Sequence, residues 1–198
     1  MSIAVLILSA GRSSRMGDSK ALLPWNGTTL LTHQCSAAIA ADVGPVFAVL
    51  GHDAEHKKAH IPAKVHVIHN PIWQSGKVSS IQRGLLSVPQ DVDGILLLSV
   101  DQPSLAQIIC TVANELRHHD ICVATHEGNR GHPIAFHSRM RPQLLALSEA
   151  DRGVMALFKN SHFAIHSVDI NHPSILWNFN TSEEYRNALN QQNQRESC

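Results

Sequence analysis

Two runs of uninterrupted apolar residues, Ile3–Leu8 and Ile95–Leu98, most narrowly limit the folds open to this chain. A strand with one face in water alternates apolar and polar side chains, whereas a strand of a parallel sheet that is covered on both faces is apolar throughout. Both runs are far shorter than the roughly 20 residues of a membrane-spanning helix. We therefore expect two central strands of a mainly parallel sheet, and no membrane span.

Short β-branched or leucine-rich runs alternate with longer amphipathic runs, which is typical of β-α-β units. The expected strands are residues 3–9, 45–50, 65–68, 94–100, 121–125, 133–136 and 163–169. The expected helices are residues 29–41, 54–60, 78–88, 105–118, 139–148, 152–160 and 183–190. Thr28 and Ser104 are the expected N-caps of the first and fourth helices. The pattern predicts a three-layer α/β domain over residues 1–190 and a flexible tail over residues 191–198.

Composition excludes several classes of protein. Lys and Arg number 16, as do Asp and Glu, so the formal charge at pH 7 is zero and a nucleic-acid partner is not expected. The 198 residues are 43% apolar, which suits one hydrophobic core. The N-terminal apolar run lacks the flanks of a signal peptide. None of the four cysteines forms a C-x-x-C pair, and three lie in apolar segments, so we expect reduced thiols and a cytoplasmic protein.

The ligand crevice of an open α/β sheet lies beyond the carboxyl ends of its central strands. Residues 10–20 and Asp101-Gln102-Pro103 are expected there. The first segment combines two glycines with three cations: Gly11, Gly17, Arg12, Arg15 and Lys20. Glycines let backbone N–H groups turn toward phosphate oxygens. The segment is neither a Walker A loop nor a dinucleotide fingerprint, and it predicts a phosphate-binding loop, with a plain polar connection as the alternative.

Asp101 ends the second apolar strand, where a carboxylate is costly unless a cation compensates its charge. Mg²⁺ is the expected cation, because it commonly combines few protein ligands with phosphate oxygens. The alternative is that Asp101 caps the following helix.

Residues 8–24 follow the pattern L-x-A-G-x-S-x-R-M-G-x-x-K-x-L-L-P, which resembles the signature of nucleotidyltransferases that build molybdopterin dinucleotide cofactors. Residues 70–84, 99–103 and 131–133 are similar to segments of the molybdenum cofactor cytidylyltransferase branch of the MobA-like NTP transferase superfamily. The resemblance covers most of the chain. It implies a Rossmann-like nucleotidyltransferase fold and an enzyme that couples CTP to the phosphate of molybdopterin, releases pyrophosphate and uses Mg²⁺.

The resemblance also implies roles for single residues. The implied catalytic residues are Arg15, Lys20 and Asp101. The implied nucleotide-binding residues are Ser9, Ala10, Gly11, Arg12, Gly17, Lys20, Trp73, Gly76, Ser79 and Ser80. The implied acceptor-binding residues are Gln102, Pro103, Gly131, His132 and Asp151, and the implied metal ligands are Asp101 and Asn180. Core packing is the alternative for Trp73, and helix capping for the two serines. The helix that follows Gly76 would offer an anion-binding N-terminus.

Several positions depart from the cytidylyltransferase pattern. Ala10 agrees with it, whereas Asn178 and Asn180 replace two acidic residues and resemble the guanylyltransferase branch. Met155 stands in place of an arginine, and Lys77, in place of a methionine, is a candidate to replace the lost cation. The alternatives are therefore a guanylyltransferase, a transferase for another phosphorylated acceptor, and a catalytically weakened protein that binds nucleotide or helps to load a recipient molybdoenzyme. The segment before residue 183 can also cap a helix.

His52, His56 and His60 have the spacing of one helix face and could bind Zn²⁺ or Ni²⁺. A solvated helix face explains the same spacing.

Overall fold

A computed structural model gives the fold, and the structure describes residues 1–12 and 19–196. Its main sheet has seven strands in the order β5-β4-β1-β6-β8-β7-β9. These are β1 Ile3–Ser9, β4 Val46–Leu50, β5 His66–His69, β6 Gly94–Ser99, β7 Ile121–His126, β8 Asn129–His137 and β9 Ile165–Asp169. All neighbouring strands pair in parallel except that β8 runs antiparallel to both β6 and β7. The prediction of a mainly parallel sheet is confirmed.

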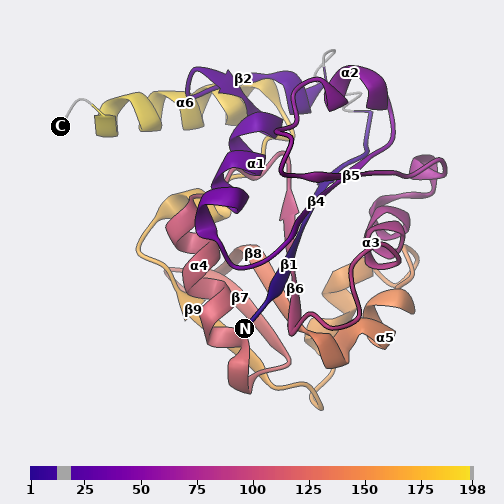
Figure 1. The fold of residues 1–198 in the computed structure, drawn as a ribbon. Helices are drawn as coiled ribbons and strands as arrows, with labels where there is room; N and C mark the ends of the chain where they lie inside the picture. Colours follow the sequence, from indigo (N-terminus) through magenta and orange to yellow (C-terminus); the bar gives the residue numbers. More distant parts are fainter. Residues whose placement is uncertain (13–18, 197–198) are drawn as a thin grey trace.

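Helices cover both faces of the sheet (Figure 1). They are α1 Leu30–Ala41, α2 Ala54–Lys58, α3 Lys77–Leu85, α4 Ala106–Asn114, α5 Arg141–Leu145 and α6 Ser182–Glu196. Helices α1 and α4 lie together on one face, and α3 and α5 lie on the other. Short 3₁₀ turns extend this set at Lys20–Leu22, Trp73–Ser75, Glu115–His118, Ser138–Met140, Gly153–Lys159 and Pro173–Leu176.

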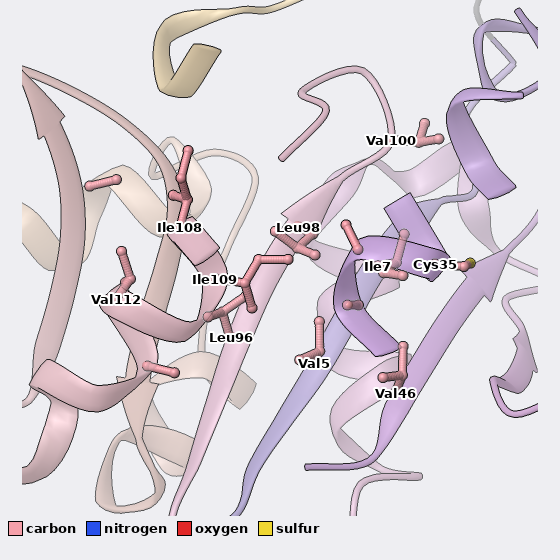
Figure 2. Packing of buried hydrophobic residues seen from close by; sticks show 14 of the residues in the cluster. Val5, Ile7, Cys35, Val46, Leu96, Leu98, Val100, Ile108, Ile109 and Val112 are labelled. Atoms are coloured by element: carbon pink, nitrogen blue, oxygen red, sulfur yellow. The ribbon is translucent and has the colours of Figure 1, made fainter. Parts of the chain in front are cut away.

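The two central strands are β1 and β6, as their apolar runs predicted. Val5 and Ile7 of β1 pack with Leu96 and Leu98 of β6 against α1 and α4, as Figure 2 shows. The alternate residues of the same strands, including Leu6, belong to the second cluster, under α3 and α5. Because both faces of each strand are buried, the side chains on both faces are apolar, and the alternation of a half-exposed strand is absent from β1 and β6.

Strand β8 differs most from its predicted extent. A two-residue turn, Glu127-Gly128, joins it to β7, and both residues have positive φ angles of 50° and 77°. Such angles suit the tight hairpin turns that match strand twist. The chain therefore reverses at this turn, and the expected acceptor residues Gly131 and His132 lie within β8.

The helix ends also correct the sequence analysis. The N-cap of α1 is Thr29, whose hydroxyl accepts from Thr32 N at 3.1 Å, one residue after the expected Thr28. Leu105 precedes α4, so neither Ser104 nor Asp101 caps that helix. Residues 153–159, expected as an α-helix, form a 3₁₀ helix. At the other end of the chain α6 continues past Asn190 to Glu196, so residues 191–196 are helical where we expected a flexible tail. Among the described helices, none combines the length and the apolar content that crossing a bilayer requires.

Candidate active site

A cavity of about 340 Å³ lies beyond the carboxyl ends of β1 and β6. This is the position that the crevice rule predicts, because the chain runs from β1 to β4 and β5 on one side of β1 and then crosses from β5 to β6 on its other side. The lining residues are Leu8, Ser9, Ala10, Gly11, Lys20, Ala21, Lys57, Trp73, Gln74, Gly76, Lys77, Ser80, Ser99, Val100 and Asp101. Arg12, the residue after Gly11, is exposed. The expected residues Arg15 and Gly17 lie outside the described residues.

Lys20, Asp101 and Asn180 meet at this cavity although they are far apart in the sequence. The Lys20 ammonium donates to Asn180 Oδ1 at 3.1 Å and lies 3.5 Å from Asp101 Oδ2. Both oxygen atoms thus converge on one cationic centre. A carboxylate and an amide oxygen are hard donors of the kind that Mg²⁺ and Mn²⁺ accept. The residues present therefore fit a divalent cation held by Asp101 and Asn180.

An aromatic cluster brings Asn180 to the cavity. Phe179 N donates to Asp101 O at 2.9 Å, and the Phe179 ring packs 5.2 Å from the ring of Trp25. Trp25 belongs to the small hairpin of β2 Pro24–Trp25 and β3 Thr28–Thr29, which sequence analysis missed and which follows the Lys20 turn. Trp177 and Tyr185 complete the cluster. The apolar contacts of this cluster therefore join the C-terminal segment to the segment that carries Lys20.

Thr181 and Glu184 form a capping box at the start of α6. Glu184 N donates to the Thr181 hydroxyl at 3.2 Å, and Glu184 Oε2 accepts from the backbone N–H groups of Thr181 and Asn180, each at 2.8 Å. These hydrogen bonds lower the pKa of Glu184. The capping alternative is thus present, and it leaves the side chain of Asn180 free to face Lys20.

Gln34 holds the turn that carries Asp101. Its side chain is fully buried in α1, and its Nε2 donates to Ser99 O and to Gln102 O, each at 2.9 Å. Its Oε1 accepts from Ser104 N at 2.9 Å. One side chain therefore satisfies three backbone groups on both sides of Asp101. Its partners are backbone atoms, which leave no signature in a sequence, so the sequence analysis did not identify it.

Asn70 organises the segment between β5 and α3. It is fully buried, and its Nδ2 donates to the hydroxyls of Ser79 at 2.9 Å and Ser80 at 3.0 Å. The Ser79 hydroxyl donates onward to Gly76 O at 2.8 Å. Ser80 lines the cavity. Ser79 is buried in this hydrogen-bond network within α3, whose N-cap is Gly76 without a side-chain cap, so neither serine caps the helix as the alternative supposed.

Trp73 is a wall of the cavity and a packing residue at once. Its ring lies 5.3 Å from that of His52 in an edge-to-face arrangement. A Cβ atom on Gly51 would lie 2.5 Å from Trp73 Cβ, so glycine is needed at position 51 for this approach.

The N-terminus of α3 already holds an anion. Glu149 Oε1 accepts from Val78 N at 2.6 Å, and a Cβ atom on Gly76 would lie 2.3 Å from the same oxygen. The anion-binding N-terminus that we expected is therefore occupied by a carboxylate of this chain. Beside it stands Lys77, where surrounding protein removes water from the ammonium and lowers its pKa, while Asp101 and Glu149 act in the opposite direction.

Two further cavities follow the first, each sharing wall residues with the one before it. One of about 170 Å³ shares Leu8, Lys77 and Ser99 with it, and also has Met155 in its wall. The next, of about 230 Å³, shares His132 and Met155 with the second. Lys77 and Met155 thus line one cavity, which fits the expectation that Lys77 replaces a cation lost at position 155.

The expected acceptor residues divide between three places. Gln102, Gly131 and His132 line the third cavity. Pro103 lies in another cavity, beside Trp25, and Asp151 is exposed in a turn. His132 Nδ1 is buried and has no hydrogen-bond partner among the described residues, and burial followed by the charge of Lys77 lowers its pKa to about 3. His132 is therefore neutral and can donate or accept a hydrogen bond toward a bound molecule.

The histidine spacing does not produce a metal site in the part of the chain that the structure describes, where no cluster of His, Cys, Asp and Glu could hold an ion. The rings of His56 and His60 lie 5.7 Å apart, but His52 precedes α2 and packs against Trp73 instead of joining them. His56 instead contacts Asp53 at 3.2 Å.

Comparison with curated proteins finds relatives over nearly the whole chain. The molybdenum cofactor cytidylyltransferase of Escherichia coli K12 is 26% identical over 188 residues, with 94% of this chain and 95% of that protein covered. The nicotine blue oxidoreductase of Paenarthrobacter nicotinovorans is 28% identical, with 93% and 95% covered. A probable molybdenum cofactor guanylyltransferase of Bacillus cereus ATCC 10987 is 27% identical, with 93% and 94% covered.

Solved structures share the fold. The Rv0371c protein of Mycobacterium tuberculosis H37Rv is 24% identical and superimposes with a TM-score of 0.85, with 96% of this chain and 98% of that chain covered. A second structure of the same protein, described as a complex with manganese, has a TM-score of 0.80, is 23% identical and covers 96% of this chain and 99% of that chain. Residues 5–167 match the family described as the MobA-like NTP transferase domain. With most of its length inside that match, the chain belongs to the MobA-like NTP transferase domain family and is a nucleotidyltransferase.

Proposed function

We propose that this enzyme transfers the nucleoside monophosphate of CTP to the phosphate of molybdopterin and releases pyrophosphate. The observation that carries the proposal is the convergence of Lys20, Asp101 and Asn180 at a cavity lined by the backbone of residues 9–11. This places a cation, two oxygen donors and a glycine-containing backbone segment around one space, as in-line attack on the α-phosphorus of a nucleotide requires.

The residues of this chain position and neutralise the reactants. Ser9, Ala10 and Gly11 form the wall against the triphosphate, and Lys20 contributes positive charge beside it. A divalent cation held by Asp101 and Asn180, with Mg²⁺ preferred, would neutralise charge that develops on the transferred phosphate. Arg15 and Gly17 remain proposed partners of the triphosphate from outside the described residues.

The second and third cavities are the proposed place of the acceptor. Apolar side chains make up about half of their walls, with Lys77 next to the nucleotide cavity, Glu149 and Arg152 also in the second cavity, and His132 shared by the two. A flat heterocycle with one phosphate fits this arrangement, because the phosphate can meet Lys77 while the ring system packs on apolar side chains. The cytoplasmic location and a recipient molybdoenzyme stay predictions.

The preference for CTP rests on Ala10. Its side chain is buried at the cavity wall, where a methyl group takes space that a purine base needs. A pocket that gains or loses one methyl group changes discrimination by about 10- to 200-fold. GTP is the alternative nucleotide, because Asn178 and Asn180 resemble the guanylyltransferase branch.

Pyrophosphate release tests the proposal directly. Wild-type protein with Mg²⁺, molybdopterin and CTP, GTP or ATP in turn should release pyrophosphate fastest with CTP. The Ala10→Gly variant should shift the ratio of kcat/KM for CTP and GTP toward GTP by about tenfold. A faster wild-type reaction with GTP would refute the choice of base, and no release with any nucleotide would refute the transfer itself.

A further inference from the structure

Lys57 is buried at the floor of the nucleotide cavity. Its residue surface is 1% exposed, and it projects from α2 toward the end of β1. The ammonium donates to Ser9 O at 3.0 Å and to Gly11 O at 3.2 Å. A lysine so deeply buried is uncommon, because removing an ammonium from water costs free energy unless other groups compensate it.

The backbone carbonyl of Ala10, which lies between those of Ser9 and Gly11, also accepts a hydrogen bond. His52 N donates to Ala10 O at 2.9 Å. Three successive carbonyl groups, those of residues 9, 10 and 11, therefore accept hydrogen bonds from the short segment 52–57. In a planar trans peptide unit the C=O of one residue and the N–H of the next point in opposite directions. Holding the carbonyl groups thus directs the N–H groups of Ala10, Gly11 and Arg12 away from α2.

The charge of Lys57 is needed for its hydrogen bonds to this backbone and not for the packing of α2. An apolar side chain of similar length would fill the same space without the cost of burying a charge. Burial lowers the pKa of Lys57 to about 8, and the charge of Asp53 offsets only part of that effect. Besides Asp53, the ammonium is compensated by its hydrogen bonds to the carbonyl groups of Ser9 and Gly11.

We propose that Lys57 is a positioning residue for nucleotide binding, whose ammonium holds the backbone at Ser9 and Gly11 in the shape that receives the phosphates. This inference rests on the proposed function, and it adds to that function a residue outside the sequence motifs at residues 8–24, 70–84, 99–103 and 131–133. Because the same ammonium lines the cavity, it also adds positive charge beneath the phosphates.

Two adjacent lysines supply a matched experiment. Lys57→Met removes the charge and both hydrogen bonds while it keeps the length of the side chain. Lys58→Met makes the same change at an exposed position of the same helix. Lys57→Gln keeps an amide donor, which separates the hydrogen bonds from the charge. The measurements are KM for CTP, KM for molybdopterin and kcat, and amide hydrogen exchange over residues 9–12 in the absence of nucleotide.

Lys57→Met should raise KM for CTP at least about tenfold, because hydrogen bonds to charged groups contribute about 1.5–3 kcal/mol. It should leave KM for molybdopterin unchanged and speed amide exchange at residues 10–12. Lys57→Gln should fall between Lys57→Met and wild type, and Lys58→Met should match wild type. Where Lys57→Met does not fold, Lys57→Gln carries the same comparison.

Folded Lys57→Met protein with wild-type KM for CTP, or with wild-type exchange at residues 10–12, would overturn the inference. An equal rise in both KM values would also overturn it, because a general structural role would produce that result. Wild-type protein that binds no nucleotide would instead refute the proposed function. In that case amide exchange at residues 10–12 would still show whether Lys57 holds this backbone.

Discussion

The ammonium of Lys20 lies 3.5 Å from Asp101 Oδ2, although one residue follows β1 and the other follows β6. The contact joins the two strand ends that border the cavity. Since Asn180 Oδ1 accepts from the same ammonium, a change at any of these three side chains alters the charge balance of the other two.

Asp101→Asn should lower kcat/KM for transfer about a hundredfold or more, because it removes the negative charge that would hold the proposed divalent cation while the side chain keeps its shape. Pyrophosphate release measures the loss, and thermal unfolding should show a fold that is retained. Asp91→Asn, at an exposed turn, is the control and should behave as wild type. Wild-type turnover by Asp101→Asn would remove Asp101 from the proposed mechanism.

Gln34→Leu should destabilise the fold and impair transfer together. It removes the donor to the Gln102 carbonyl, the acceptor of Ser104 N–H and one of the two donors to the Ser99 carbonyl, so the free energy of unfolding should fall by about 3 kcal/mol. The turn that carries Asp101 should loosen, which should lower kcat. Urea unfolding and turnover measure the two effects, with the exposed Gln107→Leu as control. Unchanged kcat in folded Gln34→Leu would show that the turn does not depend on Gln34.

The affinity for nucleotide should fall as the pH rises through about 8, the pKa of Lys57. A bound polyphosphate favours the protonated ammonium and raises its pKa, so above about pH 8 binding requires uptake of a proton. Lys20, Lys77 and Asp101 line the same cavity, and Asp53 lies at the start of α2, so the comparison is the slope in wild type against that in Lys57→Met. Titration calorimetry across this pH range should show a shallower slope in the variant, and equal slopes would contradict the assignment.

Burial of neutral His132 should make the free energy of unfolding decrease as the solution is acidified. In the folded protein its pKa is about 3, against an ordinary value of 6.5, so on acidification the unfolded chain takes up a proton before the folded protein does. The contribution of His132 is constant above about 6.5 and falls as the pH falls from there toward about 3. Denaturant unfolding at several pH values measures this slope. His132→Gln should reduce it, and an unchanged slope in that variant would show that His132 titrates normally.

The sequence was sufficient to predict the parts of the fold that depend on apolar pattern. The runs in β1 and β6 predicted the sheet centre, and the crevice rule then predicted the region where Lys20 and Asp101 meet. Glycine and charge placement, together with the family resemblance, indicated residues 9–11 and 101 as cavity residues. These predictions succeed because they depend on local pattern and on a general property of parallel sheets.

The sequence could not reveal the side chains that support the site through backbone contacts. Gln34 lies in an apolar helix and Lys57 beside another lysine, and nothing in either pattern distinguishes a buried polar group from a solvated one. Glu149 reaches Val78 N across 71 positions of sequence, a pairing that only the tertiary structure creates. The same limit explains why Ser79 reads as a pocket residue although its hydroxyl is engaged with Asn70.

The packing of Phe179 on Trp25 can form only late in translation, after the strands of the sheet have been synthesised. A nascent chain leaves the ribosome from its N-terminus, so the strands that form the sheet emerge before the segment that carries Asn180. Asn180, the hydrogen-bond partner of Lys20, lies 160 positions later in the chain. A partly synthesised chain can therefore build the sheet and the nucleotide cavity while the proposed metal site still lacks Asn180, so the proposed transfer requires that the C-terminal aromatic residues dock.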